Sequence, residues 1–327
     1  MNRWTYLVIL LGGLLVGCKS DPTPTVTTPP SKKNVSIPAF QGDQAYQHVQ
    51  TQLDFGYRVP GTAPHKEQIE WMAASMEELG AKVIRQNFKA DFLDQTDVDC
   101  TNVMAQFNPD HPRRVLLAAH FDSRMIAEKD DERQDEPIPG ADDGGSGVAV
   151  LMEIGRLIAE HPIDLGVDLL FLDAEDQGSP GDATGRTWAL GSQLWSANPV
   201  PAGYRAMYGI LLDMVGSKNA TFGKEDYSRE YAPELTDKIW TLAKRMGYSD
   251  LFQDFNAGSV MDDHFYINRL AQIPMTDIIN ISPENRRSFG YYHHTHDDDI
   301  DIIDPRTLRV VGQVVTAVLY KESGGTF

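Results

Sequence analysis

Short apolar runs that alternate with amphipathic segments constrain the fold of this chain most strongly. Runs with the character of buried strands occur at residues 81–88, 101–107, 115–120, 167–176, 208–216 and 273–281. Apolar residues recur at helical spacing over residues 65–80, 147–161, 233–247 and 305–320. Strands that alternate with helices favour a largely parallel sheet with helices on both faces. The sequence therefore predicts an α/β three-layer sandwich with a central, mostly parallel mixed β-sheet, formed by residues 39–327 as a single domain.

The N-terminal segment differs in composition from the rest of the chain. Arg3 precedes an apolar run at residues 6–16, which is short for a bilayer span and typical of a signal peptide. Cys18 follows Leu-Val-Gly, an order that resembles a bacterial lipobox, in which the cysteine is lipidated. The alternative is an ordinary secretory signal with an incidental cysteine. We expect a signal peptide at residues 1–17 and a Pro/Thr-rich, lipid-anchored tether at residues 18–38.

From this N-terminus we expect the protein in the bacterial cell envelope, facing the periplasm or exposed at the surface, with the lipid anchor as its only membrane contact.

The net charge is −18, from 29 Lys and Arg against 47 Asp and Glu. Such a chain has no general field to attract phosphate backbones, so no nucleic-acid partner is expected. The second cysteine, Cys100, has no partner in the mature chain and is interpreted as a structural thiol. The sequence indicates no oligomeric state.

Residues able to bind a metal fall where the predicted strands end. The five of this type are His120, Asp143, Asp176, Asp213 and His294. Three of them end predicted strands, one lies in a glycine-rich turn before a predicted helix, and one lies in the polar loop after the last strand. Ligands of open α/β sheets bind beyond the carboxyl ends of the strands. Imidazole and carboxylate ligands together suit zinc, so we expect a zinc site there.

Each of these residues also has an ordinary explanation. An Asp before Gly-Gly is usual turn chemistry, and a histidine in a polar loop needs no ligand. The Asp run at residues 297–299 is interpreted as solvated or helix-capping, not as ligands. The acidic loop at residues 126–136 is interpreted as a solvated surface loop, with a lid as the alternative. The five residues together favour a metal site more than any one of them alone.

The order of the motifs carries a resemblance to a known family. The segments are LAAHFDS from residue 117, GADDGGSG from residue 140, FLDAED from residue 171, LLDMVG from residue 211, MDDH from residue 261 and HHTHDD from residue 293. In this order they resemble the zinc aminopeptidase fold of the M28 peptidase family. The resemblance runs from RVPGT, at residues 58–62, to the C-terminal helix.

That family implies two chemistries, aminopeptidase action with two zinc ions and glutaminyl cyclisation with one. Residues 211–222, 261–264 and 294–308 are similar to the corresponding segments of the animal-type glutaminyl cyclases and their bacterial relatives. The resemblance thus implies a zinc-dependent catalytic domain that converts the N-terminal Gln of peptides and proteins into pyroglutamate and releases ammonia. An M28-type di-zinc aminopeptidase is the alternative.

The resemblance also implies a ligand set. One zinc ion would be held by Asp143, Asp176 and His294. In the aminopeptidase interpretation a second zinc ion would be completed by His120 and Asp213. In the cyclase interpretation His120 would not bind the metal itself but would lie next to the residues that do, with Asp122 orienting its ring.

Three carboxylates are assigned catalytic roles by the same resemblance. Glu175 would move a proton from the attacking amine to the leaving nitrogen. Its side chain is expected to point away from that of Asp176, because neighbours on a strand face opposite ways. Asp213 and Asp263 would form a hydrogen-bonded acidic pair. The expected substrate pocket is formed by Trp188, Phe289 and His293.

The chain departs from the cyclase pattern at two positions. Glu175–Asp176 stands where the cyclases have Glu-Glu, and His293 stands where they have Trp. The resemblance further implies a cis peptide bond after Asp143.

Overall fold

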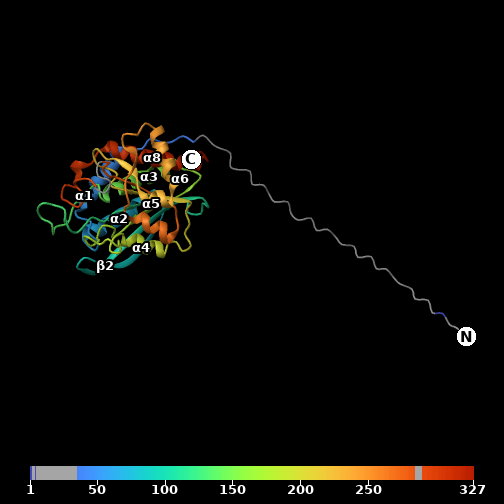
Figure 1. Cartoon of the computed structure of the whole chain (residues 1–327), viewed down its shortest axis with the longest axis horizontal. Helices are drawn as coiled ribbons and strands as arrows, with labels where there is room; N and C mark the ends of the chain where they lie inside the picture. Colours follow the sequence, from blue (N-terminus) through green and yellow to red (C-terminus); the bar gives the residue numbers. More distant parts are fainter. Residues whose placement is uncertain (2–3, 5–34, 284–288) are drawn as a thin grey trace. The chain divides into compact units, whose positions relative to one another are not determined.

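The computed structural model describes residues 1, 4, 35–283 and 289–327 (Figure 1). The predicted signal peptide, the lipidation site Cys18 and most of the tether lie outside the described residues. Val35 and Ile37, at the end of the predicted tether, pack partly buried against the core, so the folded unit begins before residue 39. Among the described residues, no helix has the length and apolar character of a membrane span.

A mixed six-stranded sheet forms the centre of the folded unit. Its strands lie in the order β1 (Lys82–Phe92), β2 (Gln95–Phe107), β4 (Gly166–Leu172), β3 (Arg114–His120), β5 (Tyr208–Asp213) and β8 (Met275–Ile279). β2 is antiparallel to both β1 and β4, whereas β4, β3, β5 and β8 are mutually parallel. The predicted mixed, mostly parallel sheet is confirmed. A separate parallel pair joins β6 (Phe222–Lys224) to β7 (Phe252–Asn256).

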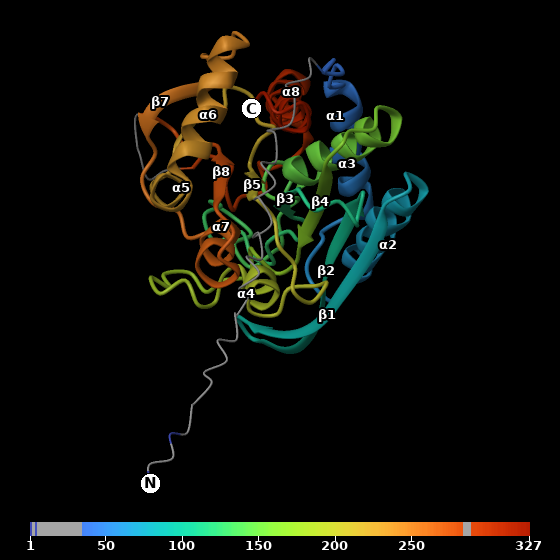
Figure 2. The same cartoon turned by 90° about the vertical axis from the view of Figure 1, so that its right-hand side faces the viewer.

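Helices cover both faces of the sheet, as the three-layer prediction requires (Figure 2). One face is covered by α1 (Gly42–Phe55), α2 (Ala63–Glu78), α3 (Gly145–Glu160) and α8 (Pro305–Ser323), and the other by α4 (Leu190–Ala197), α7 (Asp263–Tyr266) and the π-helix η1 (Ile267–Ala271). Two further helices, α5 (Asp226–Tyr231) and α6 (Pro233–Arg245), pack at the β8 edge.

The strand side chains alternate between these two layers. Leu117 and Leu169 belong to the larger core cluster on the α3 side, whereas Leu116 and Leu170 pack with Trp195 of α4 on the other side. All are fully buried. Strands buried on both faces have no polar face, which is why they appear in the sequence as continuous apolar runs.

Capping residues set where two of the predicted helices begin. α2 begins at Ala63 because Thr62 accepts a hydrogen bond from the backbone N–H of His65, with Pro64 in the first turn. α8 begins at Pro305, and the side chain of Asp304 accepts from the N–H of Arg306. The predicted helices at residues 65–80 and 305–320 are therefore confirmed to within a few residues at each end.

Several elements were not predicted, and α1 is the longest of them. Its buried side includes Ala45, Val49 and Gln52, so its apolar stripe is weak. It packs against α3 and α8. Gly42 permits this approach, because a Cβ there would lie 2.2 Å from the carbonyl oxygen of Pro305.

Candidate metal centre and active-site cavity

The carboxyl ends of three parallel strands bring the predicted residues to one place. His120 is the last residue of β3 and Asp213 is the last residue of β5. Glu175 and Asp176 follow β4, and Asp143 precedes α3. A cavity of about 630 Å³ opens at this edge. Its lining includes the following predicted metal, catalytic and pocket residues, but not His120 or Asp263: Asp143, Glu175, Asp176, Trp188, Asp213, Phe289, His293 and His294.

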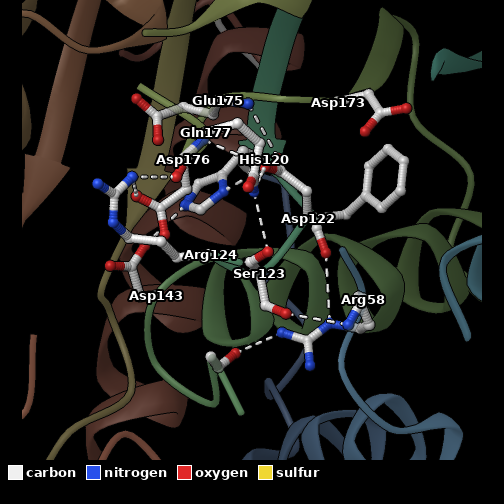
Figure 3. Close-up of polar contacts among 12 residues, drawn as sticks. Arg58, His120, Asp122, Ser123, Arg124, Asp143, Asp173, Glu175, Asp176 and Gln177 are labelled. Carbon is white, nitrogen blue, oxygen red and sulfur yellow. Dashed lines mark hydrogen bonds and ion pairs between the residues drawn. The ribbon is translucent and has the colours of Figure 1, made fainter. Parts of the chain in front are cut away.

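The turn that carries Glu175 and Asp176 is held by a buried carboxylate. Asp122 accepts hydrogen bonds from the backbone N–H of Glu175 at 3.0 Å and of Asp176 at 3.1 Å, and from the side-chain amide of Gln177 at 2.9 Å (Figure 3). The expectation that strand pleating separates the two acids is wrong, because β4 ends at residue 172. A turn with Ala174 at φ +54° places them instead.

A second buried carboxylate holds the turn that carries Asp143. Asp298 accepts from the N–H of Asp142 at 2.7 Å and of Asp143 at 3.1 Å, and it is fully buried. The interpretation of residues 297–299 as a solvated or capping run is therefore wrong for Asp298. The expected cis bond after Asp143 is also wrong, since the one cis bond in the described part of the chain is Val200–Pro201. Gly144 makes the turn through a positive φ of 81°.

The predicted zinc ligands meet at the imidazole of His294. Its Nε2 lies 3.0 Å from Asp176 Oδ1 and 3.9 Å from Asp143 Oδ2. All three residues are buried, and Asp176 Oδ2 has no hydrogen-bond partner. His293 lies in the same place, with its Nε2 3.8 Å from Asp143 Oδ2. Asp143, His293 and His294 form one compact group of possible ligands, so the residue expected in the pocket wall also faces the metal centre.

A second group of possible ligands forms around His120. Its Nε2 lies 3.1 Å from Asp143 Oδ1 and 3.2 Å from Asp213 Oδ1. This is the set expected for a second zinc ion. The other ring nitrogen, Nδ1, is buried without a hydrogen-bond partner and lies 3.6 Å from Asp122. That distance is too long for a hydrogen bond, so Asp122 mainly holds the Glu175 turn instead of the His120 ring.

The predicted hydrogen-bonded pair of Asp213 and Asp263 is not seen among the described residues. Asp262, not Asp263, lines the cavity. Both oxygens of Asp263 are buried without a hydrogen-bond partner, so the expected bond between Asp213 and Asp263 is missing from the described part of the chain. Burial raises the pKa of Asp213 to about 7, and the charge of Asp143 adds to this. Burial, together with the charge of Asp213, also raises the pKa of Asp262 to about 7.

Glu175 lines the cavity without belonging to any of the three groups of possible ligands among the described residues. Burial raises its pKa well above the ordinary value, and the charges of Asp262 and Asp176 raise it further. A carboxyl group with a raised pKa in a cleft can both accept and donate a proton near neutral pH.

Aromatic side chains form part of the cavity wall, as predicted. The ring of Trp188 stacks on that of His294, with centroids 5.9 Å apart and planes at 11°. Phe289 stacks on His293 at 4.3 Å. Gly178 makes room for the indole, because a Cβ there would lie 1.9 Å from Trp188 Cδ2.

The loop at residues 126–136 contributes residues that were not predicted. Glu128 Oε1 lies 2.6 Å from His294 Nδ1, and Lys129 Nζ contacts His293 Nδ1. Glu128 and Lys129 line the cavity, so the start of this loop is not a solvated surface segment. The only signal in the sequence that could have indicated a place for this loop in the site was its position between His120 and Asp143.

A third buried group supports the segment that carries Asp262. His264 Nε2 lies 3.0 Å from Glu225 Oε2. Glu225 in turn accepts from the N–H groups of Tyr227 and Ser228 at the start of α5. The histidine is fully buried, so it is not a solvated loop residue, and with Asp262 and Asp277 it forms a third compact group of possible ligands.

Comparisons with known proteins agree with this arrangement. The model of peptidase family M28 matches residues 102–319. A solved glutaminyl cyclase of Bacteroides thetaiotaomicron, bound to N-acetylhistamine, is 43% identical with a TM-score of 0.84, over 87% of this chain and 99% of that one. Aminopeptidase YwaD of Bacillus subtilis is 27% identical over 70% of this chain, which spans 46% of that relative.

The glutaminyl-peptide cyclotransferase-like protein of Bos taurus is 24% identical over 82% of this chain and 72% of its own length. The chain thus spans about half the length of the curated aminopeptidase and nearly the whole of the solved cyclase. The family match covers more than half of the chain and includes every predicted zinc ligand. This chain therefore belongs to peptidase family M28.

Proposed function

We propose that this chain is a glutaminyl-peptide cyclotransferase, which converts the N-terminal glutamine of peptides and proteins into pyroglutamate and releases ammonia. The observation that carries the proposal is the likeness to a solved glutaminyl cyclase through nearly the whole of that protein. The cavity supports it, because possible metal ligands, a separate carboxylate and an aromatic wall line one space. The direct test is ammonia release from a Gln-initiated peptide. Ammonia equal to the peptide consumed supports the proposal, and peptide turnover without ammonia contradicts it.

The donor set fits zinc. Asp143, Asp176 and His294 would hold the ion through two carboxylates and one imidazole nitrogen, which leaves a position for substrate. The unpartnered oxygen of Asp176 supports this, since a buried carboxylate oxygen without a hydrogen bond is costly unless something else satisfies it. When bound there, zinc supplies a Lewis acid that polarises the γ-carbonyl of the substrate glutamine.

Glu175 is the residue placed to move the proton. The substrate α-amine must lose a proton as its nitrogen bonds to the γ-carbon, and the departing amide nitrogen must gain one to leave as ammonia. Glu175 lines the cavity, and its backbone is fixed by the hydrogen bond to Asp122. One carboxyl group can thus take the proton from the amine and return it to the leaving nitrogen.

Asp213 and Asp262 would stabilise the oxygen or nitrogen atoms that change charge during ring closure. Both line the cavity, and the charge of Asp213 helps to raise the pKa of Asp262. Two carboxylates that interact in this way hold a proton between them more easily than either does alone. The pair can therefore donate a hydrogen bond to the reacting amide.

Trp188 would select the glutamine side chain. Its ring lines the cavity and stands parallel to that of His294, so a flat amide at the metal centre can pack against the indole. The substrate's own amine is the nucleophile, and holding it near the γ-carbon is a large part of the rate enhancement.

The geometry of the site also offers support for the aminopeptidase alternative. His120, Asp143 and Asp213 form a second compact set of possible ligands, as two-metal hydrolysis would need. The zinc content of the purified protein distinguishes the two. One zinc ion per chain supports the cyclase, and two per chain support the aminopeptidase.

We also infer that the enzyme is a lipoprotein of the bacterial cell envelope, anchored at Cys18. The supporting features are the apolar run at residues 6–16 and the Leu-Val-Gly that precedes the cysteine. Metabolic labelling with a radioactive fatty acid tests this. The label is expected on the wild-type chain and not on Cys18→Ser, and equal labelling of both would contradict the inference.

A further inference from the structure

The imidazole of His294 is held by a carboxylate on the side away from the metal centre. Glu128 Oε1 lies 2.6 Å from His294 Nδ1. An ionised carboxylate only accepts hydrogen bonds, so Nδ1 carries the proton. Nε2 is then the nitrogen left to bind a metal ion, and it is the atom that faces Asp176 at 3.0 Å. This is the carboxylate–histidine arrangement that orients metal ligands in many proteins.

Glu128 is itself held in place by a fully buried guanidinium. Arg124 Nε donates to Glu128 Oε2 at 2.6 Å. The other two nitrogens of the same group donate to the backbone carbonyls of Asp176, at 2.5 Å, and Gly178, at 3.0 Å. One side chain thus ties together the residue behind His294 and the turn that carries another zinc ligand (Figure 3 shows Arg124 reaching Asp176).

The same guanidinium also contacts the cavity wall. Arg124 Cζ lies 4.6 Å from the centroid of the Trp188 ring, a cation–π contact. The ring of His294 stacks on the indole as well, at 5.9 Å. Trp188 is therefore positioned by Arg124 directly and by His294, whose ring is held by Glu128.

We propose that Arg124 and Glu128 are positioning residues, which fix the zinc-binding tautomer and orientation of His294 and hold Trp188 against the metal centre. The proposal deepens the function proposed above, because one buried pair would set both metal affinity and the fit of the glutamine side chain. The alternative role for Glu128, which is 22% exposed and lines the cavity, is to bind the substrate amine directly.

The test compares zinc affinity in wild type, Glu128→Gln and Arg124→Lys by competition with a chelator. Glu128→Gln removes the charge and allows the amide to donate to His294 Nδ1, which favours the tautomer that cannot bind zinc through Nε2. We expect zinc to bind about 10- to 100-fold more weakly. Arg124→Lys keeps the charge, but its single ammonium nitrogen cannot reach the three acceptors that the guanidinium contacts through three nitrogens, so zinc binding should weaken and KM for a Gln-initiated peptide should rise.

Glu70→Gln is the matched control. Glu70 forms a two-bond ion pair with Arg85 at 2.6 and 2.8 Å, but on the surface. It undergoes the same loss of charge away from the cavity, so its zinc affinity should equal that of wild type. Thermal unfolding without zinc serves as the folding check. A positioning role predicts that Glu128→Gln lowers the gain in Tm on adding zinc more than it lowers the Tm of the zinc-free protein.

Zinc affinity of Glu128→Gln within about twofold of the Glu70→Gln control would overturn the proposal. So would a rise in KM with unchanged zinc affinity, which would assign Glu128 to the substrate amine. If Arg124→Lys does not fold, the Glu128→Gln measurement decides alone. The zinc measurement needs no turnover, so failure to form pyroglutamate would count against the proposed function and leave this inference standing.

Discussion

Asp298→Asn is the change that most directly tests how the metal-binding turn is built. The carboxylate of Asp298 accepts one backbone N–H at each oxygen, from Asp142 at 2.7 Å and from Asp143 at 3.1 Å. Asparagine keeps one oxygen and puts an NH₂ group where the other was, so one buried N–H loses its acceptor and faces another donor. Leaving a buried donor unsatisfied costs about 1–3 kcal/mol.

The expected result is a free energy of unfolding lower by about 2 kcal/mol, measured by urea denaturation of the zinc-free protein. Zinc affinity should fall as well, because the shifted backbone carries Asp143. Asp297→Asn is the matched control, since Asp297 is the exposed neighbour in the same acidic run. If Asp298→Asn unfolds at the same urea concentration as Asp297→Asn and binds zinc equally well, the reasoning is refuted.

Three further variants and conditions test separate parts of the account. Glu175→Gln should keep zinc and the fold but lose about 10²-fold or more in turnover, and zinc loss would show that this residue is a ligand. His294→Ala should abolish zinc binding measured by chelator competition, whereas His296→Ala should not, because His296 belongs to none of the groups of possible metal ligands among the described residues. Burial lowers the pKa of His48 from 6.5 to about 4, so the folded state resists its protonation. Stability should therefore fall as pH drops from 6.5 towards 4, and His48→Gln should lessen that fall in urea titrations at pH 7 and 5; an unchanged pH dependence would contradict this.

The sequence located the residues that end strands, because an apolar run stops where the chain leaves the sheet. His120 and Asp213 could be placed in this way, and both are the last residues of their strands. The alternation of strands and helices also predicted that the two side chains lie close together, because the carboxyl ends of parallel strands lie at one edge of the sheet. The outline of the site could therefore be predicted from the amino-acid sequence alone.

The supporting residues could not be found in the same way. Asp298 and Glu128 lie in acidic stretches that have no local pattern, and their roles depend on contacts with segments 155 and 166 residues away. Asp262 and Asp263 are adjacent at the start of α7, so only the backbone direction decides which of them faces the cavity. α1 was missed because a stripe of Ala and Gln is too weak to mark a buried helix face.

The central claim is tested most directly by following the masses of two peptides, Gln-Ala-Ala and Leu-Ala-Ala, with the zinc-loaded protein from residue 35 onward, which contains all of the folded residues that the structure describes. The account predicts that the first peptide loses the mass of one ammonia molecule and that the second does not change, because the substrate's own amine attacks its γ-carbonyl. Release of free leucine from the second peptide, without ammonia loss from the first, would contradict the account and assign the chain to aminopeptidase chemistry.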